Sequence, residues 1–308
     1  MRRTLAAAGL AALALAAPAA HAQTIAITGG RVFPVSGPPI DNATVLMRDG
    51  RIVAVGANVT VPADAERVDA TGKWVTPGIF NPSTLLGVME ISAVAETRQA
   101  GARNTESDRV HAALRVWESV NTASVLFAAA RNEGVTTVML HPTGGLVAGQ
   151  AAVLDIVDAS TTSDMLVAAP VAMIAQVENE GAANAASRGE VLLRLRELFD
   201  DVRAYQRNRA SYDRGETREY AASRADLEAL IPVLEGRLLM IVGAESAGEI
   251  ETVLTLAREY GLKVAIAGAS EGWRVADKLA AAKVPVFVGA MNNIPQSFAT
   301  LGARQENA

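Results

Sequence analysis

Apolar and polar residues alternate along residues 23–75 in short runs, and turn signals separate these runs. Alternation with a period of two is typical of half-buried β-strands. The pair Asp49-Gly50 lies between two of the runs, and an Asp-Gly pair in this position is a strong signal for a β-hairpin. Residues 23–76 therefore predict a small domain of short β-strands, which its size alone would leave marginally stable.

From residue 77 onward, short apolar runs alternate with amphipathic stretches. The candidate strands are the apolar runs at 79–80, 135–140, 151–156, 166–174, 238–242, 263–267 and 286–288. Amphipathic helices are predicted over residues 110–120, 191–206, 248–260 and 273–282. Buried strands that alternate with helices are typical of βα units and a parallel sheet, so residues 77–308 predict an α/β domain.

Residues 1–22 have the three-part pattern of a secretory signal peptide. Residues 2–3 are both arginine, residues 5–17 are apolar, and residues 20–22 read Ala-His-Ala, a small-x-small cleavage site. The apolar core is too short to span a bilayer. We therefore expect export by the general secretory route, cleavage after Ala22, a periplasmic or secreted location, and no membrane attachment after cleavage.

Composition narrows the class of protein further. The chain has 308 residues, a formal net charge of −5, no cysteine, and an apolar fraction of 50%. This is the composition of a mildly acidic globular protein with enough apolar material for a sizeable core. No stripe of basic residues with interleaved aromatic residues occurs, which argues against nucleic acid as a partner.

Residues 76–87, which read Thr-Pro-Gly-Ile-Phe-Asn-Pro-Ser-Thr-Leu-Leu-Gly, are the most informative stretch of the chain. Together with the preceding hairpin and the Gly-Val-Thr-Thr-Val run at 134–138, they resemble the amidohydrolase superfamily, in particular its periplasmic, imidazolonepropionase-like branch. The resemblance covers essentially all of the chain after residue 22. It implies a (β/α)8-type TIM barrel with a small N-terminal half of a β-sandwich, whose other half returns from the C-terminus.

The candidate strands number about seven, fewer than the eight of a complete barrel. Residues 287–308 resemble the segment that precedes strand 8 in the family. The resemblance thus implies an incomplete barrel domain over residues 77–308, truncated before the last strand and its metal-binding Asp. Open strand edges and an unfilled interior lead us to expect a chain that is unstable or oligomeric on its own.

The resemblance also implies where a metal ion would bind. The family supplies a His-x-His pair from strand 1, histidines from strands 5 and 6, and an Asp from strand 8. Residues i and i+2 of a strand share one face, so a His-x-His pair can hold a single zinc ion. The corresponding positions here are Ser83, Leu85, Gly243 and Ala267, with Asn81 at the family's strand 1 Asp. We therefore expect no metal cofactor in this chain, in contrast to the zinc of the resembled family.

A count of histidines leads to the same expectation without an alignment. The chain contains three histidines, His21, His111 and His141, and His21 would leave with the signal peptide. His111 is predicted on a helix surface, and His141 in a loop that follows a strand. Two histidines are too few for the family's set.

Barrel enzymes place catalytic groups at the C-terminal ends of their strands, where several other candidates lie. The possible pocket residues are Asn81, His141, Gly144, Gly145, Glu245 and Asn292. Glu245 could hold a weakly bound metal together with His141, and Ser83 could act as a nucleophile only with His141 as its base. The plainer interpretation is a loop histidine bonded to the backbone, a glycine-rich turn and turn-forming asparagines.

These observations predict an amidohydrolase-family protein of the hydrolase class that acts on non-peptide carbon–nitrogen bonds, such as those of cyclic amides. This copy is expected to be catalytically degraded or truncated, as in a pseudoenzyme. One alternative is an enzyme with a reduced site around His141 and Glu245, or a longer chain that carries the missing strand. The other is a non-catalytic periplasmic protein that binds a small cyclic amide, forms a homo-oligomer, or pairs with an active paralogue.

Overall fold

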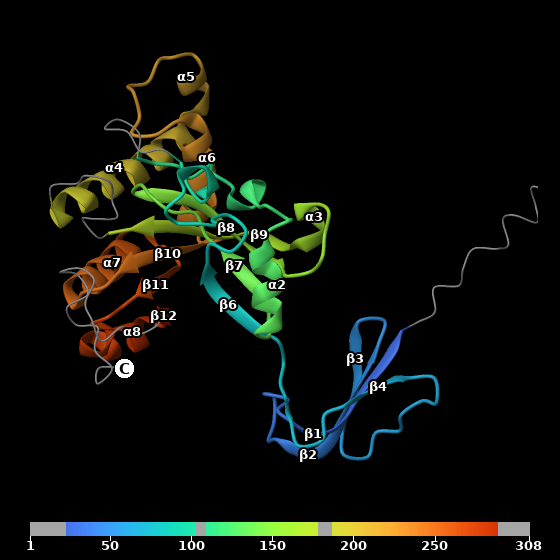
Figure 1. The fold of residues 1–308 in the computed structure, drawn as a ribbon. Coiled ribbons are helices and arrows are strands. Elements are labelled where there is room, and N and C mark those ends of the chain that lie inside the picture. Colours follow the sequence, from blue (N-terminus) through green and yellow to red (C-terminus); the bar gives the residue numbers. More distant parts are fainter. Residues whose placement is uncertain (1–22, 103–108, 178–186, 289–308) are drawn as a thin grey trace, which may run out of the picture. The chain divides into compact units, whose positions relative to one another are not determined.

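The computed structural model describes residues 23–102, 109–177 and 187–288. Contacts divide the chain into two compact units, and the boundary lies between Pro77 and Gly78. The first unit is a small sheet, and the second contains a larger sheet with helices (Figure 1).

Five strands form the N-terminal sheet. They are β1 (Thr24–Val32), β2 (Ile40–Arg48), β3 (Arg51–Gly56), β4 (Glu66–Asp69) and β5 (Trp74–Val75). Strand β1 pairs antiparallel with β2 and parallel with β4 and β5. The predicted hairpin at Asp49-Gly50 is confirmed, because β2 and β3 pair antiparallel across it with Arg48 opposite Arg51. Both turn residues have positive φ, 52° and 71°, as a two-residue type I′ turn requires.

The core of the N-terminal sheet is small. Val32, Ala43 and Val45 are buried in one cluster, while Ile52 and Trp74 are exposed. Few apolar side chains are thus removed from water, so this unit gains little from hydrophobic burial.

The second unit is built on a seven-stranded sheet in which strands that follow one another in sequence are also neighbours. The strands are β6 (Ile79–Thr84), β7 (Val135–Leu140), β8 (Val147–Asp155), β9 (Leu166–Gln176), β10 (Leu239–Ala244), β11 (Val264–Gly268) and β12 (Val286–Val288). One apolar cluster takes residues from the inner face of every strand from β7 to β12. The sheet therefore curls around a packed interior as a nearly closed barrel, as the resemblance implied (Figure 1).

Strand β8 corrects one expectation. The sequence pattern predicted a parallel sheet, but β8 runs antiparallel to both β7 and β9. The other neighbouring pairs of the seven-stranded sheet are parallel. Only residues 141–146 connect β7 to β8. A parallel crossover needs a dozen or more residues, so a connection of this length permits only a hairpin.

The α-helices are α2 (Val125–Asn132), α3 (Thr162–Met165), α4 (Arg188–Arg207), α5 (Arg209–Asp213), α6 (Arg224–Leu234), α7 (Ala247–Tyr260) and α8 (Ala276–Ala282). The described residues also form short 3-10 helices, η1 (Ala95–Thr97), η2 (Val116–Ser119) and η3 (Gly272–Val275). The largest apolar cluster joins α4, α6 and α7 to the outer face of β9, β10 and β11. Among the described residues, no helix combines the length and the apolarity that crossing a bilayer requires.

The helix predicted over residues 248–260 is confirmed as α7, and its ends show why it forms there. The side chain of Ser246 accepts a hydrogen bond from the backbone N–H of Glu249. In return, the Glu249 carboxylate accepts a hydrogen bond from the backbone N–H of Ser246. This capping box satisfies two backbone donors at the N-terminus. Gly261 ends the helix with a φ of 72°, a left-handed conformation that glycine adopts without strain.

The helix predicted over residues 110–120 is wrong. Only η2 forms in this segment, because the backbone before it pairs with β8. The backbone N–H of His111 donates to Val147 O at 2.8 Å, and that of Gln150 donates to Leu114 O at 2.8 Å. Pairing with a distant strand thus prevailed over the helical spacing of the apolar residues.

Candidate functional site

A cavity of about 100 Å³ lies where the C-terminal ends of the parallel strands meet. Its lining is mostly apolar, with Met139, Ile174, Ile241 and Phe287 from four different strands. Backbone and small side chains of Pro82, Ala175, Gly243 and Ala267 complete the apolar part, and the polar lining side chains are Ser83, His141 and Gln176. The C-terminal strand ends are where barrel enzymes place their chemistry, so this cavity is the candidate site.

Three of the four positions that the resemblance assigned to metal ligands lie in this cavity. Ser83, Gly243 and Ala267 all line it. Leu85 does not, and instead packs against a separate apolar cluster that contains Phe127. The expectation that Leu85 shares a face with Ser83 fails because β6 ends at Thr84 and its register already shifts between Asn81 and Thr84.

Ser83 and His141 form the polar centre of the cavity. The Ser83 Oγ lies 3.2 Å from His141 Nε2, and His141 Nδ1 lies 3.3 Å from the carbonyl oxygen of Pro142. A carbonyl can only accept, so Nδ1 carries the proton in this arrangement and Nε2 accepts from the Ser83 hydroxyl. Burial lowers the pKa of His141 below its ordinary value, and the bond to Pro142 opposes this only in part. The imidazole is therefore neutral at neutral pH.

Glu245 is not brought together with His141. Its Oε2 accepts hydrogen bonds from the backbone N–H of Ser270, at 2.9 Å, and from the Ser270 hydroxyl. The carboxylate lies against Gly268, where an added Cβ would come within 2.2 Å of Oε1. Glu245 therefore fixes the loop after β11, and it is absent from the lining of the cavity.

Asn81, Gly144 and Gly145 do not line the cavity either. The Asn81 Oδ1 accepts from the Ser83 backbone N–H at 3.1 Å, so Asn81 holds the backbone that carries the serine. Gly144 and Gly145 have φ values of 88° and 74° and form the short connection between β7 and β8. Asn292 lies outside the described residues.

His111 differs from its expected surface position. Its side chain is buried, and its backbone is bonded to β8. It does not line the cavity at the strand ends, so it adds nothing to the polar centre there.

Comparisons with known proteins agree with this architecture. No family model matches the chain. It is 47% identical over 57 residues to a dihydroorotase of Anaeromyxobacter sp. (strain K), which covers 18% of this chain and 13% of that protein. It is 30% identical over 122 residues to an imidazolonepropionase of Acidiphilium cryptum (strain JF-5), which covers 35% of this chain and 30% of that protein. A solved amidohydrolase of Thermotoga maritima MSB8 matches the fold with a TM-score of 0.80 and 24% identity, covering 92% of this chain and 74% of that chain.

The chain is thus similar in sequence, over these segments, to a dihydroorotase and an imidazolonepropionase, and similar in fold to a solved amidohydrolase. The sequence matches supply the local resemblance, and the solved structure supplies the fold. The matched segments nevertheless span less than a third of the length of the two curated relatives.

The zinc ion that the resemblance implies does not fit the residues of this cavity. The lining offers one imidazole, whose Nε2 already faces Ser83, together with a hydroxyl and an amide. A catalytic zinc site usually has three nitrogen, sulfur or carboxylate ligands from the protein. Across residues 23–102, 109–177 and 187–288, no group of three or more His, Cys, Asp or Glu side chains is placed to hold an ion.

Two polar residues near this edge of the sheet were missed from the sequence. The Gln176 Oε1 is buried without a hydrogen-bond partner among the described residues, and Gln176 lines the cavity. The Nε and Nη1 atoms of Arg109 are likewise buried without a partner in the described chain. A polar residue that closes a long apolar strand, as Gln176 closes β9, is the signal that could have revealed it.

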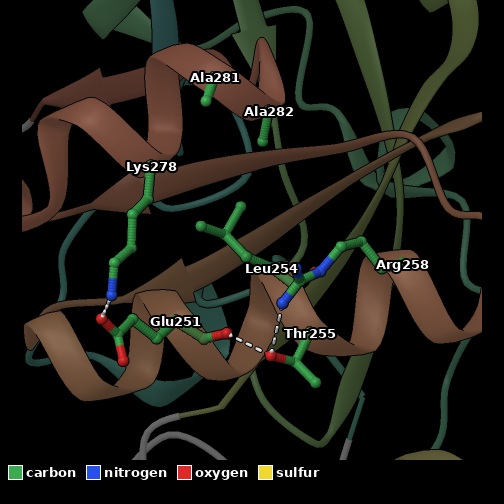
Figure 2. Close-up of a pocket in the computed structure, with 7 residues that line it drawn as sticks. All are labelled: Glu251, Leu254, Thr255, Arg258, Lys278, Ala281 and Ala282. Atoms are coloured by element: carbon green, nitrogen blue, oxygen red, sulfur yellow. Dashed lines mark hydrogen bonds and ion pairs between the residues drawn. The ribbon is translucent and has the colours of Figure 1, made fainter.

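A larger groove elsewhere on the molecule has no polar centre like that of Ser83 and His141. This groove of about 560 Å³ lies between α7 and α8. Figure 2 shows the residues that line it. Lys278 pairs with Glu251, and Arg258 donates to Thr255 Oγ1 at 3.3 Å (Figure 2). Its charged groups are thus bonded within α7 or between α7 and α8, and no histidine lines the groove. The smaller cavity at the strand ends has the better arrangement for chemistry.

Proposed function

We propose that the barrel mouth binds small cyclic amides, the substrate type of a hydrolase that acts on non-peptide carbon–nitrogen bonds, and that metal-dependent catalysis has been lost from it. The observation that carries this proposal is the position of Ser83, Gly243 and Ala267 in one cavity. Three positions assigned to metal ligands by resemblance converge there, but their side chains are not ligands for zinc. We further propose that the protein works in the periplasm after cleavage of residues 1–22.

The magnitude of the loss supports a degraded site. A catalytic metal lowers the pKa of its bound water from about 15.7 to about 7. At about 1.36 kcal/mol per unit, this is roughly 12 kcal/mol of nucleophile activation. The hydrogen bond between Ser83 and His141 does not supply an activation of this size. Hydrolysis of an unactivated amide is therefore expected to be far slower than in a metal-dependent relative.

The lining supports a neutral ligand. Its polar side chains, Ser83, His141 and Gln176, can donate hydrogen bonds to an amide group or accept them from it. The lining contains no charged side chain, because the imidazole of His141 is neutral. The cavity volume of about 100 Å³ is below the roughly 300–1,000 Å³ of ligand pockets. We therefore expect the amide edge of a ring to enter the cavity while the rest of the ring stays in the open mouth.

Metal analysis and binding measurements test this proposal. We expect purified protein to contain far less than one zinc per chain, and to bind a neutral cyclic amide such as 2-pyrrolidinone in ligand-observed NMR. Ala267→Leu should fill the cavity and abolish binding, whereas Ala281→Leu, in the groove of Figure 2, should leave it unchanged. Stoichiometric zinc together with chelator-sensitive turnover of the amide would overturn the proposal.

A second candidate is a non-catalytic partner that pairs with an active paralogue or with another copy of the chain. It is favoured by apolar side chains on β6 and β12, the two strands that end the sheet. Ile79, Phe80 and Val288 are 54%, 49% and 67% exposed. Sedimentation velocity separates the two candidates, because this one predicts a stable assembly that Phe80→Glu dissociates, and a monodisperse monomer would exclude self-association.

A further inference from the structure

Ser83 is placed as a nucleophile would be. Its side chain lies at the mouth of the cavity and is exposed, so a ligand can reach it. The bond from its backbone N–H to Asn81 Oδ1 fixes the residue at the irregular end of β6. Its hydroxyl is 3.2 Å from His141 Nε2, at the limit of the heavy-atom range in which a base can take a proton.

His141 is held in the form that a base requires. The carbonyl oxygen of Pro142 accepts from Nδ1, so the lone pair of Nε2 faces the Ser83 hydroxyl. The lining contains no carboxylate or other basic group. Burial, which lowers the pKa of His141, therefore has no opposing charge within the cavity and keeps the imidazole neutral.

Gln176 adds a hydrogen-bonding group to the lining of the cavity. Its Oε1 is buried and unpartnered among the described residues. An amide oxygen accepts hydrogen bonds, so Gln176 can bind a donor such as a water molecule. Nucleophile, base and acceptor thus line the same small volume.

We propose that Ser83 and His141 form a nucleophilic pair that accepts short, uncharged acyl groups from activated esters. This inference rests on the proposed function only in that the mouth admits small carbonyl compounds. The Ser83 Oγ forms a bond to the carbonyl carbon while its proton passes to His141 Nε2. The bond to the leaving alcohol then breaks, and the alcohol oxygen receives that proton. Water later attacks the acyl-serine by the same route, which releases the acid and restores the serine.

The size of the cavity limits the acyl group. One water molecule takes up about 30 Å³ in the liquid, so a cavity of about 100 Å³ holds roughly the volume of three waters. An acetyl group has three heavy atoms and fits this volume. Met139, Ile174 and Phe287 provide apolar surface for its methyl group.

The pair is expected to be weak. In serine proteases, exchanging the aspartate that orients the histidine for its amide lowers the rate by about 10⁴-fold, although the geometry stays intact. Here a backbone carbonyl takes the place of that carboxylate. Covalent labelling is therefore a better readout than turnover.

The experiment exposes the full chain to p-nitrophenyl acetate and follows acylation by intact mass and peptide mapping. We expect one acetyl group per chain on Ser83, and none at that position in Ser83→Ala. His141→Gln keeps an acceptor for the serine hydroxyl but removes the base, so labelling should slow about 100-fold or more, the contribution of a general base. Ser92→Ala removes another exposed serine and should label at the wild-type rate. A butyrate or longer ester should label more slowly than the acetate.

Two outcomes would overturn the inference. One is labelling spread over lysines with Ser83 unmodified, and the other is wild-type labelling of Ser83 in His141→Gln. Circular dichroism and thermal melts of each variant separate a chemical effect from loss of the fold. If 2-pyrrolidinone binds while Ser83 stays unmodified, the nucleophilic pair is wrong and the proposed function stands. If Ser83 is labelled while no cyclic amide binds, the proposed function is wrong and the pair stands.

Discussion

The two halves of the barrel sheet contribute differently to the candidate site. Strands β6–β9 and their ends supply the polar groups, Ser83, His141 and Gln176. Strands β10–β12 supply apolar wall, including Gly243 and Ala267 at positions where the resemblance would place histidines. Strands β10 and β11 pack on long helices in the largest apolar cluster together with β9, whereas the connections between β6 and β9 are short or irregular. The regular half, β10–β12 with its helices, thus contributes apolar packing, and the irregular half, β6–β9, contributes the polar groups of the site.

The helix layer of the regular half offers the largest expected effect. Phe199 on α4 is fully buried in the largest apolar cluster. Phe199→Ala removes that side chain and leaves a cavity, so it should lower the free energy of unfolding by about 3–5 kcal/mol in urea titrations. Leu193→Ala on the same helix is the matched control, because Leu193 is 65% exposed and its loss should change stability by less than about 0.5 kcal/mol. Similar changes in the free energy of unfolding for both variants would contradict the packing of this face of α4 against the core.

The next largest loss of stability is expected from a substitution in the β7–β8 hairpin of the irregular half. Gly149 on β8 has a φ of 130°, and an added Cβ would lie 2.7 Å from the carbonyl oxygen of Leu114. Gly149→Ala should therefore cost about 1–3 kcal/mol, measured by thermal and urea unfolding. Gly37→Ala meets nothing within 4 Å and should be close to neutral. An unchanged melt for Gly149→Ala would mean that β8 does not lie against this segment.

The pH dependence of stability follows from the burial of His141. Its folded-state pKa lies below the ordinary value of 6.5, so the unfolded chain binds a proton more readily than the folded chain. Stability should be unaffected by this group above about pH 7, and should fall as the pH drops below about 6.5. His141→Gln should lose less stability than the wild type between pH 7.5 and pH 5 in paired denaturation curves. Parallel losses would show that His141 is exposed to solvent.

The smallest expected effect on stability belongs to Ser83. The Ser83 side chain is exposed, and within the described part of the chain its hydroxyl contacts His141 while its backbone N–H donates to Asn81. Ser83→Ala should therefore alter the free energy of unfolding by no more than about 0.5 kcal/mol. The same change should abolish acyl labelling. A large destabilisation would instead assign Ser83 a structural role in the irregular half.

The sequence predicted the regular half better because local rules apply there. On β10, Ile241 faces the interior while Met240 and Val242 face the helices, so alternation alone places Gly243 on the inner face. The capping box and Gly261 likewise fix both ends of α7 from neighbouring residues.

In the irregular half, distant contacts decide the outcome. The segment before η2 forms no helix because its backbone bonds to β8, which the spacing of its apolar residues does not reveal. The end of β6 shifts in register, so Leu85 leaves the face of Ser83. The pair of Ser83 and His141 was foreseeable only as a possibility, since it joins residues 58 positions apart.

The short connection between β7 and β8 has a consequence for the order of assembly. Leu140 pairs with Ala152 across this hairpin, whereas β6 must find β7 across a much longer loop, as Ile79 does with Val135. Closing a short loop costs less entropy than closing a long one. Contacts between near neighbours in sequence also form faster during folding. We therefore expect the β7–β8 hairpin, whose connection begins at His141, to form before β6, which carries Ser83, pairs with β7.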